Sequence, residues 1–308
     1  YIMEKRSHRH RRQKKKPTVL IWFFLAFACV IAGVAIFFIA KPNHATKQAQ
    51  DVIKQESTVI AVSSTSSSTT TQESSEVDWV KQDTAIHFPI LMYHAIHVMA
   101  PEESANANLI VDPTTFESHI QRLSNEGYYF LTPEEVHKVL TENVLPNGNQ
   151  KIIWLTFDDS LWDFYDNAYP ILQKYQVKAT NNVITSTVGS QANLSLDEML
   201  EMKNNGMSFQ DHTVTHPDLS ATDSSTQTTE MKDSKQYLDD SLNQDTIAIA
   251  YPAGRYSDTT LQIAENLDYK LGVTTNEGLA SADNGLLSLN RIRILPTTTA
   301  DSIMATIN

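Results

Sequence analysis

Cysteine is almost absent from this sequence of 308 residues, which contains only Cys29. All residues after position 40 are therefore without disulfide bonds and without thiol chemistry. Positive charge is also scarce in this region, where sixteen Lys and Arg residues stand against thirty-five Asp and Glu residues. Because nucleic acid favours basic surfaces, this composition argues against nucleic acid as a partner.

Charge of either sign is missing from residues 18–40, which read TVLIWFFLAFACVIAGVAIFFIA. At about 1.5 Å per residue, a helix of this length spans roughly 34 Å, enough to cross the apolar core of a bilayer. The preceding sixteen residues carry eight Lys and Arg and one Glu. Basic flanks stay in the cytoplasm. We therefore expect a cytoplasmic tail (1–17), a transmembrane signal anchor (18–40) and a single-pass protein of the cell membrane with its remainder extracellular.

A cleaved signal peptide is the alternative interpretation of the apolar run, and the sequence does not settle whether the anchor is cleaved. The apolar region of a signal peptide is usually about 7–15 residues long. This run is longer, and no clear A-x-A cleavage site follows it. A lipoprotein would end its apolar run at the cysteine, whereas eleven further uncharged residues follow Cys29.

Residues 41–84 are rich in Ser and Thr and poor in apolar residues, which predicts a disordered extracellular linker. From residue 85 to 308, strand and helix signals alternate. The stretch TPEEVHKVL, for example, predicts a helix that begins with Thr132 as N-cap and Glu135 at the third position. We expect strands at residues 86–94, 128–132, 151–157, 178–184, 207–211, 246–251, 271–275 and 289–295. Such alternation is typical of an α/β fold with a parallel sheet, and about eight units favour a (β/α) barrel.

Polar residues follow several of the predicted strands at the ends where a barrel enzyme places its site. His94, the pair Asp158 and Asp159, and His212 occupy such positions, and His216 follows His212 in an H-x-x-x-H spacing. Two imidazoles and one carboxylate can bind a metal ion and leave one coordination position open, as in catalytic zinc sites. H-x-x-x-H alone is a weak signal, and paired aspartates alone are often a solvated turn. Their coincidence at the strand ends of one barrel favours a metal site.

The motifs TFDD (156–159) and HTVTHP (212–217), about fifty residues apart, resemble the first two motifs of the polysaccharide deacetylases, carbohydrate esterase family 4. The resemblance covers roughly residues 86–295. It implies a distorted (β/α) barrel of about seven to eight strands in which Asp158 is the general base. It also implies that Asp159, His212 and His216 bind the metal.

Three positions depart from the family pattern. Ser160 stands where a glycine usually follows the aspartates, which could strain or narrow the site. In the third motif, AYPAG (250–254), Ala250 and Ala253 replace an arginine and a tyrosine. The missing arginine normally braces the base.

Arg291 and Arg293 are candidates to replace that arginine, although both could equally be strand salt-bridge residues or solvated. We expect Tyr251 and Ala253 to lie at the substrate pocket. A backbone N–H near Ala253 is our candidate donor to the oxyanion.

Histidine does not occur after residue 216, although the family takes its catalytic acid from a histidine near the C-terminus. The stretch PILMYHAI resembles the start of a subgroup of extracellular poly-N-acetylglucosamine deacetylases with a circularly permuted barrel. In that subgroup the last strand, with its histidine, comes first in the chain. His94 would then be the acid; loss of the acid is the alternative.

These features predict a metal-dependent hydrolase that removes N-acetyl groups from N-acetylglucosamine units. Peptidoglycan is the first choice of substrate and poly-N-acetylglucosamine the second. Zinc is the expected metal, and another divalent ion such as Co²⁺ also suits the ligands. An O-acetyl polysaccharide esterase is one alternative. A catalytically weak surface protein that binds glycans or host glycoproteins is another, and the oligomeric state is not predicted.

Overall fold

The computed structural model of the protein describes residues 77–307. The predicted cytoplasmic tail and membrane anchor, and most of the predicted linker, lie outside these residues. Among the helices of residues 77–307, none is long and apolar enough to cross a membrane.

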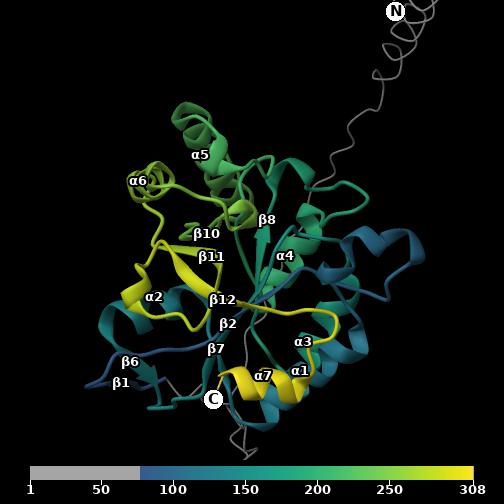
Figure 1. The fold of residues 1–308 in the computed structure, drawn as a ribbon, viewed down its shortest axis with the longest axis vertical. Helices are drawn as coiled ribbons and strands as arrows, with labels where there is room; N and C mark the ends of the chain where they lie inside the picture. Colours follow the sequence, from purple (N-terminus) through teal and green to yellow (C-terminus); the bar gives the residue numbers. More distant parts are fainter. Residues whose placement is uncertain (1–76, 308) are drawn as a thin grey trace, which may run out of the picture. The chain divides into compact units, whose positions relative to one another are not determined.

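Seven parallel strands form a closed barrel (Figure 1). Around the barrel the order follows the chain, and the last strand returns to the first because β2 pairs with both β12 and β7. The strands are β2 (Ile90–Tyr93), β7 (Ile152–Phe157), β8 (Thr180–Val183), β9 (Ser208–Asp211), β10 (Ala248–Ala250), β11 (Leu271–Glu277) and β12 (Leu289–Arg293). The predicted parallel α/β barrel is therefore confirmed.

One of the eight predicted strands, at residues 128–132, lies beside the barrel. β5 (Tyr129–Phe130) is only two residues long and pairs with the first two residues of β7, Ile152 and Ile153. β2 pairs with the rest of β7, from Trp154 onward, and so closes the barrel. Two small sheets complete the set: β1 (Trp79–Lys81) pairs with β6 (Val144–Pro146), and β3 (Ala95–Ile96) pairs with β4 (Ile110–Val111).

Helices surround the barrel, with α1 packed against α3 and α7, and α5 packed against α4 and α6 (Figure 1). The α-helices are α1 (Pro113–Asn125), α2 (Pro133–Glu142), α3 (Tyr169–Lys174), α4 (Leu196–Asn204), α5 (Ser224–Leu242), α6 (Asp258–Asn266) and α7 (Ala300–Ile307). α3 continues a π-helical turn, η2 (Phe164–Ala168), and the 3₁₀ helices are η1 (Pro101–Leu109), η3 (Thr185–Thr187), η4 (Leu219–Ala221), η5 (Pro252–Gly254) and η6 (Ala282–Asn284). The predicted capping box at α2 is present, because the side chains of Thr132 and Glu135 bond each other's backbone N–H.

The alternation of side chains along β7 explains how the barrel presents a polar end. Ile153, Leu155 and Phe157 pack with the surrounding helices, whereas Ile152 and Trp154 belong to the apolar cluster inside the barrel. Side chains alternate along a strand, so Thr156 and Asp158 share the inward direction of Trp154. The interior is therefore apolar toward the amino ends of the strands and polar toward their carboxyl ends.

Candidate active site

Asp158 lies at the carboxyl end of β7 and is buried, with 3% of its surface exposed. Its carboxylate accepts two hydrogen bonds from the Arg291 guanidinium, Nη1 to Oδ1 at 2.9 Å and Nη2 to Oδ2 at 2.7 Å. Asn182 donates from Nδ2 to Oδ1 at 2.7 Å. Burial alone would raise the pKa of Asp158, but the positive charge of Arg291, with that of His212, outweighs it and lowers the pKa well below its usual range.

Arg291 is itself fully buried on β12, and two further hydrogen bonds hold its guanidinium. Nε donates to the Thr274 carbonyl at 2.7 Å, and Nη1 also donates to Thr156 Oγ1 at 3.1 Å. Arg291 and Asp158 form a bidentate, charge-assisted pair in which the planar guanidinium sets the direction of the carboxylate. Of the two arginines suggested by the sequence, Arg291 is the one placed against Asp158.

Asp159, His212 and His216 converge on one point. Asp159 Oδ1 lies 3.4 Å from His212 Nε2 and 3.7 Å from His216 Nε2. One ligand atom from each residue lies within 4.8 Å of the other two. Two ligands at about 2.1 Å from a tetrahedral ion are about 3.4 Å apart, so this cluster has the dimensions of a metal site.

Hydrogen bonding prepares His212 as a ligand. Its Nδ1 lies 2.6 Å from the Ala250 carbonyl oxygen, which can only accept, so Nδ1 carries a hydrogen and Nε2, the nitrogen left for a metal ion, faces Asp159. Metal-binding histidines commonly use such a second bond to fix ring and tautomer. Burial would lower the pKa of His212, but Asp159 and Asp158 outweigh it and raise the pKa. A proton and a metal ion would compete for Nε2 of His212.

The backbone around this cluster adopts an uncommon conformation. Five residues other than glycine have positive φ there: Asp159 (75°), Ser160 (49°), Thr213 (66°), His216 (60°) and Ala253 (52°). Such conformations cost free energy and persist where the surroundings impose them, which is often at functional sites. Here they turn the chain sharply after β7 and β9, so that successive residues can face one centre.

His94 follows β2 and lines the same cavity as Asp159. In the parallel pairing of β2 with β7, Tyr93 lies opposite Phe157, and the Asp158 N–H donates to the Tyr93 carbonyl at 3.0 Å. His94 is therefore the next residue alongside Asp158. Burial lowers the pKa of His94, as does the charge of Arg291 and Arg293, against the opposite effect of the two aspartates.

We expected Tyr251 to lie at the substrate pocket, but its side chain points away from it. Its side chain is fully buried, its hydroxyl donates to the Leu287 carbonyl at 2.9 Å, and it packs with Ile263 of α6 and Met231 of α5. Because side chains alternate along β10, Ala250 points into the barrel and Tyr251 points outward.

Ala253 is exposed on the turn after β10. Arg293 lies at the end of β12, where its charge acts on His94.

Asn182 is a site residue that the sequence reasoning missed. It holds Asp158 from the neighbouring strand β8, next to a second polar residue, Asn181. A polar residue at an inward position near the carboxyl end of a barrel strand was the available signal.

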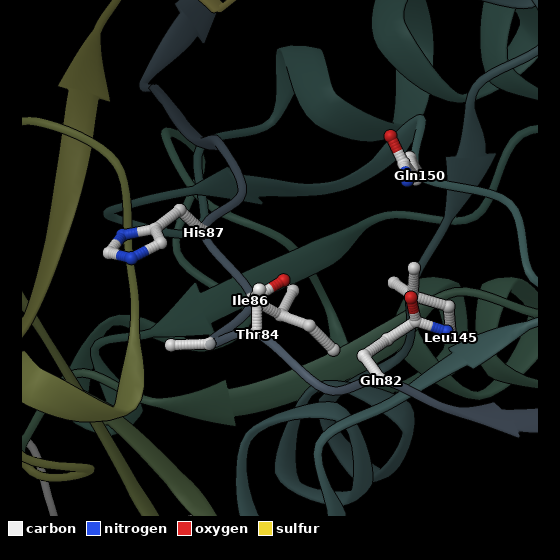
Figure 2. A pocket seen from close by; sticks show the side chains of 7 residues that line it. Gln82, Thr84, Ile86, His87, Leu145 and Gln150 are labelled. Carbon is white, nitrogen blue, oxygen red and sulfur yellow. The ribbon is translucent and has the colours of Figure 1, made fainter.

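A second cavity lies away from this cluster, at the amino ends of the strands. It has a volume of about 320 Å³ and is bordered by the segment before β2, by β6 and by the loop before β7 (Figure 2). Among the described residues that line it, His87 is the only titratable one. This cavity therefore has no set of groups comparable with that around Asp158.

Comparison with known proteins relates this geometry to a family. The polysaccharide deacetylase family profile matches residues 146–272. YxkH, a Bacillus subtilis protein assigned to the polysaccharide deacetylases, is 39% identical over 225 residues, which are 73% of this chain and 77% of YxkH. The chain belongs to the polysaccharide deacetylase family.

Two further relatives of this polysaccharide deacetylase are informative. The poly-beta-1,6-N-acetyl-D-glucosamine N-deacetylase of Staphylococcus aureus is 31% identical over 201 residues, 61% of this chain and 68% of the relative. The solved structure of the Streptococcus pyogenes deacetylase PplD in complex with acetate is 65% identical. It matches with a TM-score of 0.71 over 73% of this chain and 100% of that chain.

Ser160 stands where the family usually has glycine, and this replacement destabilises the folded protein in two ways. Its φ of 49° lies in the left-handed region, where glycine is at ease and other residues are strained. The side chain is fully buried, and its Oγ has no hydrogen-bond partner among the described residues. The substitution therefore combines backbone strain with an unpaired hydroxyl beside Asp159.

We predict that two substitutions separate these costs in the metal-free protein. Ser160→Ala removes only the unpaired hydroxyl and should raise the free energy of unfolding by about 1 kcal/mol. Ser160→Gly also removes the backbone strain. After the entropy cost of glycine is subtracted, it should raise the free energy of unfolding by roughly a further 0.5–1 kcal/mol beyond the value for Ser160→Ala. Denaturant unfolding measures both values. A glycine variant less stable than the wild type would show that Ser160 is not strained.

Proposed function

We propose that the protein is a metal-dependent N-deacetylase that hydrolyses the acetamide of N-acetylglucosamine units in a cell-surface polysaccharide. The observation that carries this proposal is the arrangement at one end of the barrel. There, the ionised carboxylate of Asp158 adjoins a cluster with metal-site dimensions, Asp159, His212 and His216. Membership of the polysaccharide deacetylase family supports the same reaction class.

Zinc fits the cluster, because two imidazoles and one carboxylate are a common catalytic zinc set with an open position. The same donors also accept Co²⁺ or another divalent ion. When bound, such an ion acts as a Lewis acid that lowers the pKa of water and polarises a carbonyl oxygen.

Asp158 is the base in this proposal. A carboxylate oxygen has two lone pairs. Oδ1 accepts from both Arg291 and Asn182, whereas Oδ2 accepts only from Arg291 among the described residues. Oδ2 therefore keeps a lone pair that can take a proton from the attacking water. Arg291 holds the carboxylate ionised and fixes its direction.

His94 is the acid, since an amine leaves poorly unless it is protonated. Because burial lowers the pKa of His94, its ring is mainly neutral in the free protein. It must therefore gain a proton during the reaction, and the proton taken by Asp158 arises beside it. The water oxygen first bonds to the carbonyl carbon to give a tetrahedral oxyanion. The carbon–nitrogen bond then breaks as His94 protonates the nitrogen, giving acetate and a free amine. We assign the backbone N–H of Ala253 as a donor to the oxyanion.

The substrate follows from two arguments. An extracellular domain on a membrane anchor, as the sequence predicts, would reach peptidoglycan. The named activity of the Staphylococcus aureus relative points instead to poly-β-1,6-N-acetylglucosamine. N-Acetylglucosamine is common to both, so the proposal rests on this unit, and parallel assays on the two glycans separate them.

We predict that the zinc-loaded full-length protein releases acetate from at least one of these glycans and that Asp158→Asn lowers kcat/KM by at least 100-fold. Asparagine keeps the shape of the side chain but cannot accept the proton. Acetate release measures the reaction, and metal content by mass spectrometry is the control, because Asp158 is outside the ligand cluster. Full activity in Asp158→Asn would refute the assigned base. No acetate from either glycan would favour a glycan-binding role.

His94→Ala separates N-deacetylation from the alternative of O-acetyl esterase activity. An alkoxide leaves more readily than an amine, so we expect loss of the acid to reduce amide hydrolysis about 100-fold and ester hydrolysis much less. The measurement compares kcat/KM of wild type and variant on matched N-acetylated and O-acetylated sugars. An equal decrease of kcat/KM on both substrates would show that His94 is not the acid.

A further inference from the structure

A cavity of about 400 Å³ opens beside the metal-site cluster. His94 and Asp159 line it, so a ligand in this cavity would adjoin the reacting group. η1, with Glu103 and Asn106, and the turn after β7, with Trp162, also line it. Ligand-binding pockets usually have volumes of this order, with apolar walls and a few placed polar groups.

Trp162 is the largest exposed apolar residue in the cavity wall, with 41% of its surface accessible. The imidazole of His97 stacks on its indole, at 5.8 Å between ring centroids and an interplanar angle of 23°. A flat aromatic surface supported on one side is suited to the apolar face of a sugar ring. Tryptophan combines a large contact area with an N–H donor.

His97 is itself held by two carboxylates. Its Nδ1 lies 2.6 Å from Asp163 Oδ2, and its Nε2 lies 3.1 Å from Glu103. Both ring nitrogens can donate to these carboxylates. Burial would lower the pKa of His97, but its hydrogen bonds to Asp163 and Glu103 outweigh it and raise the pKa. Asp163 also accepts from the Ile96 N–H at 2.8 Å. The support under Trp162 is therefore fixed before any ligand binds.

The backbone of Trp162 is joined to the same loop as the ligand Asp159. The Trp162 N–H donates to the Ala192 carbonyl at 3.1 Å, and Asn193 donates from Nδ2 to the Asp159 carbonyl at 2.8 Å. Leu161 also forms a bridge with Asn193. These bonds hold the backbone of Trp162 and of Asp159 against the same segment, residues 192–193, which helps to place an extended substrate.

The charges around the cavity restrict its ligands. Apart from Asp159, two carboxyl groups, those of Glu103 and Asp163, stand against His97, and no Lys or Arg among residues 77–307 lines the cavity. Like charges raise the cost of binding an anion. An uncharged sugar or an amino sugar suits this wall, and a sugar with a carboxylate does not.

We propose that this cavity is a second sugar subsite, in which Trp162 stacks on a neutral or amino pyranose next to the N-acetyl sugar that is hydrolysed. The inference rests on the proposed deacetylase function and adds a requirement for the neighbouring unit. The protein would then act preferentially on oligomers whose adjacent sugar has no acidic group.

Substrate length tests the subsite. We would measure kcat/KM for acetate release by the zinc-loaded full-length protein on N-acetylglucosamine and its tetramer. The tetramer should be preferred, and Trp162→Ala should reduce the tetramer-to-monomer ratio roughly tenfold, the order expected from loss of an aromatic stack. Trp162→Phe should keep most of the preference. Val80 is an exposed apolar residue on β1, outside the cavity. Val80→Ala is therefore the control and should keep the wild-type tetramer-to-monomer ratio. An unchanged ratio in Trp162→Ala overturns the subsite.

Binding separates failure of the subsite from failure of the proposed function. If the wild type releases no acetate, calorimetric titration with the tetramer still tests the cavity, and Trp162→Ala should bind about tenfold more weakly. Equal affinities overturn the subsite. A tetramer with a carboxylate on the sugar next to the acetylated unit should bind at least about tenfold more weakly than the unmodified tetramer. Equal binding of these two overturns the charge requirement.

Discussion

The buried pair of Arg291 and Asp158 is the interaction on which the arrangement of the site depends. It joins β12 to β7 across the barrel interior, although these strands are not neighbours. Removing one partner would leave an unpaired buried charge, which typically costs about 3–5 kcal/mol. The pair therefore constrains both the barrel and the direction of the proposed base. It also keeps that base ionised, since the guanidinium outweighs the effect of burial on its pKa.

Closure of the barrel explains how a site can draw on residues far apart in the chain. β2 lies between the last strand, β12, and β7, so a histidine near the start of the domain meets the aspartates of β7. The turns after β7 and β9 then bring Asp159, His212 and His216 together through residues with positive φ. The parallel strands bring these residues to the same end of the barrel, and the strained turns direct their side chains toward one point.

The sequence predicted the parallel barrel and the three clustered residues because strand periodicity and short motifs are local signals. It suggested Arg291 without choosing between it and Arg293, since only the packing of β12 shows which arginine reaches Asp158. Tyr251 was misplaced, although side-chain alternation along the predicted strand 246–251 directs Tyr251 to the opposite side from Ala250. Asn182 was overlooked, although a polar residue at an inward position near the end of a predicted strand was a usable signal. The Trp162 cavity was missed because the shape of a cavity wall has no local sequence signal.

The most direct test of this account is a crystal structure of the protein grown with zinc. We predict one ion within about 2.0–2.2 Å of Asp159, His212 and His216, with an open coordination position and with Asp158 paired to Arg291 rather than bound to the metal. An ion bound elsewhere, or one that excludes any of these three ligands, would contradict the central claim.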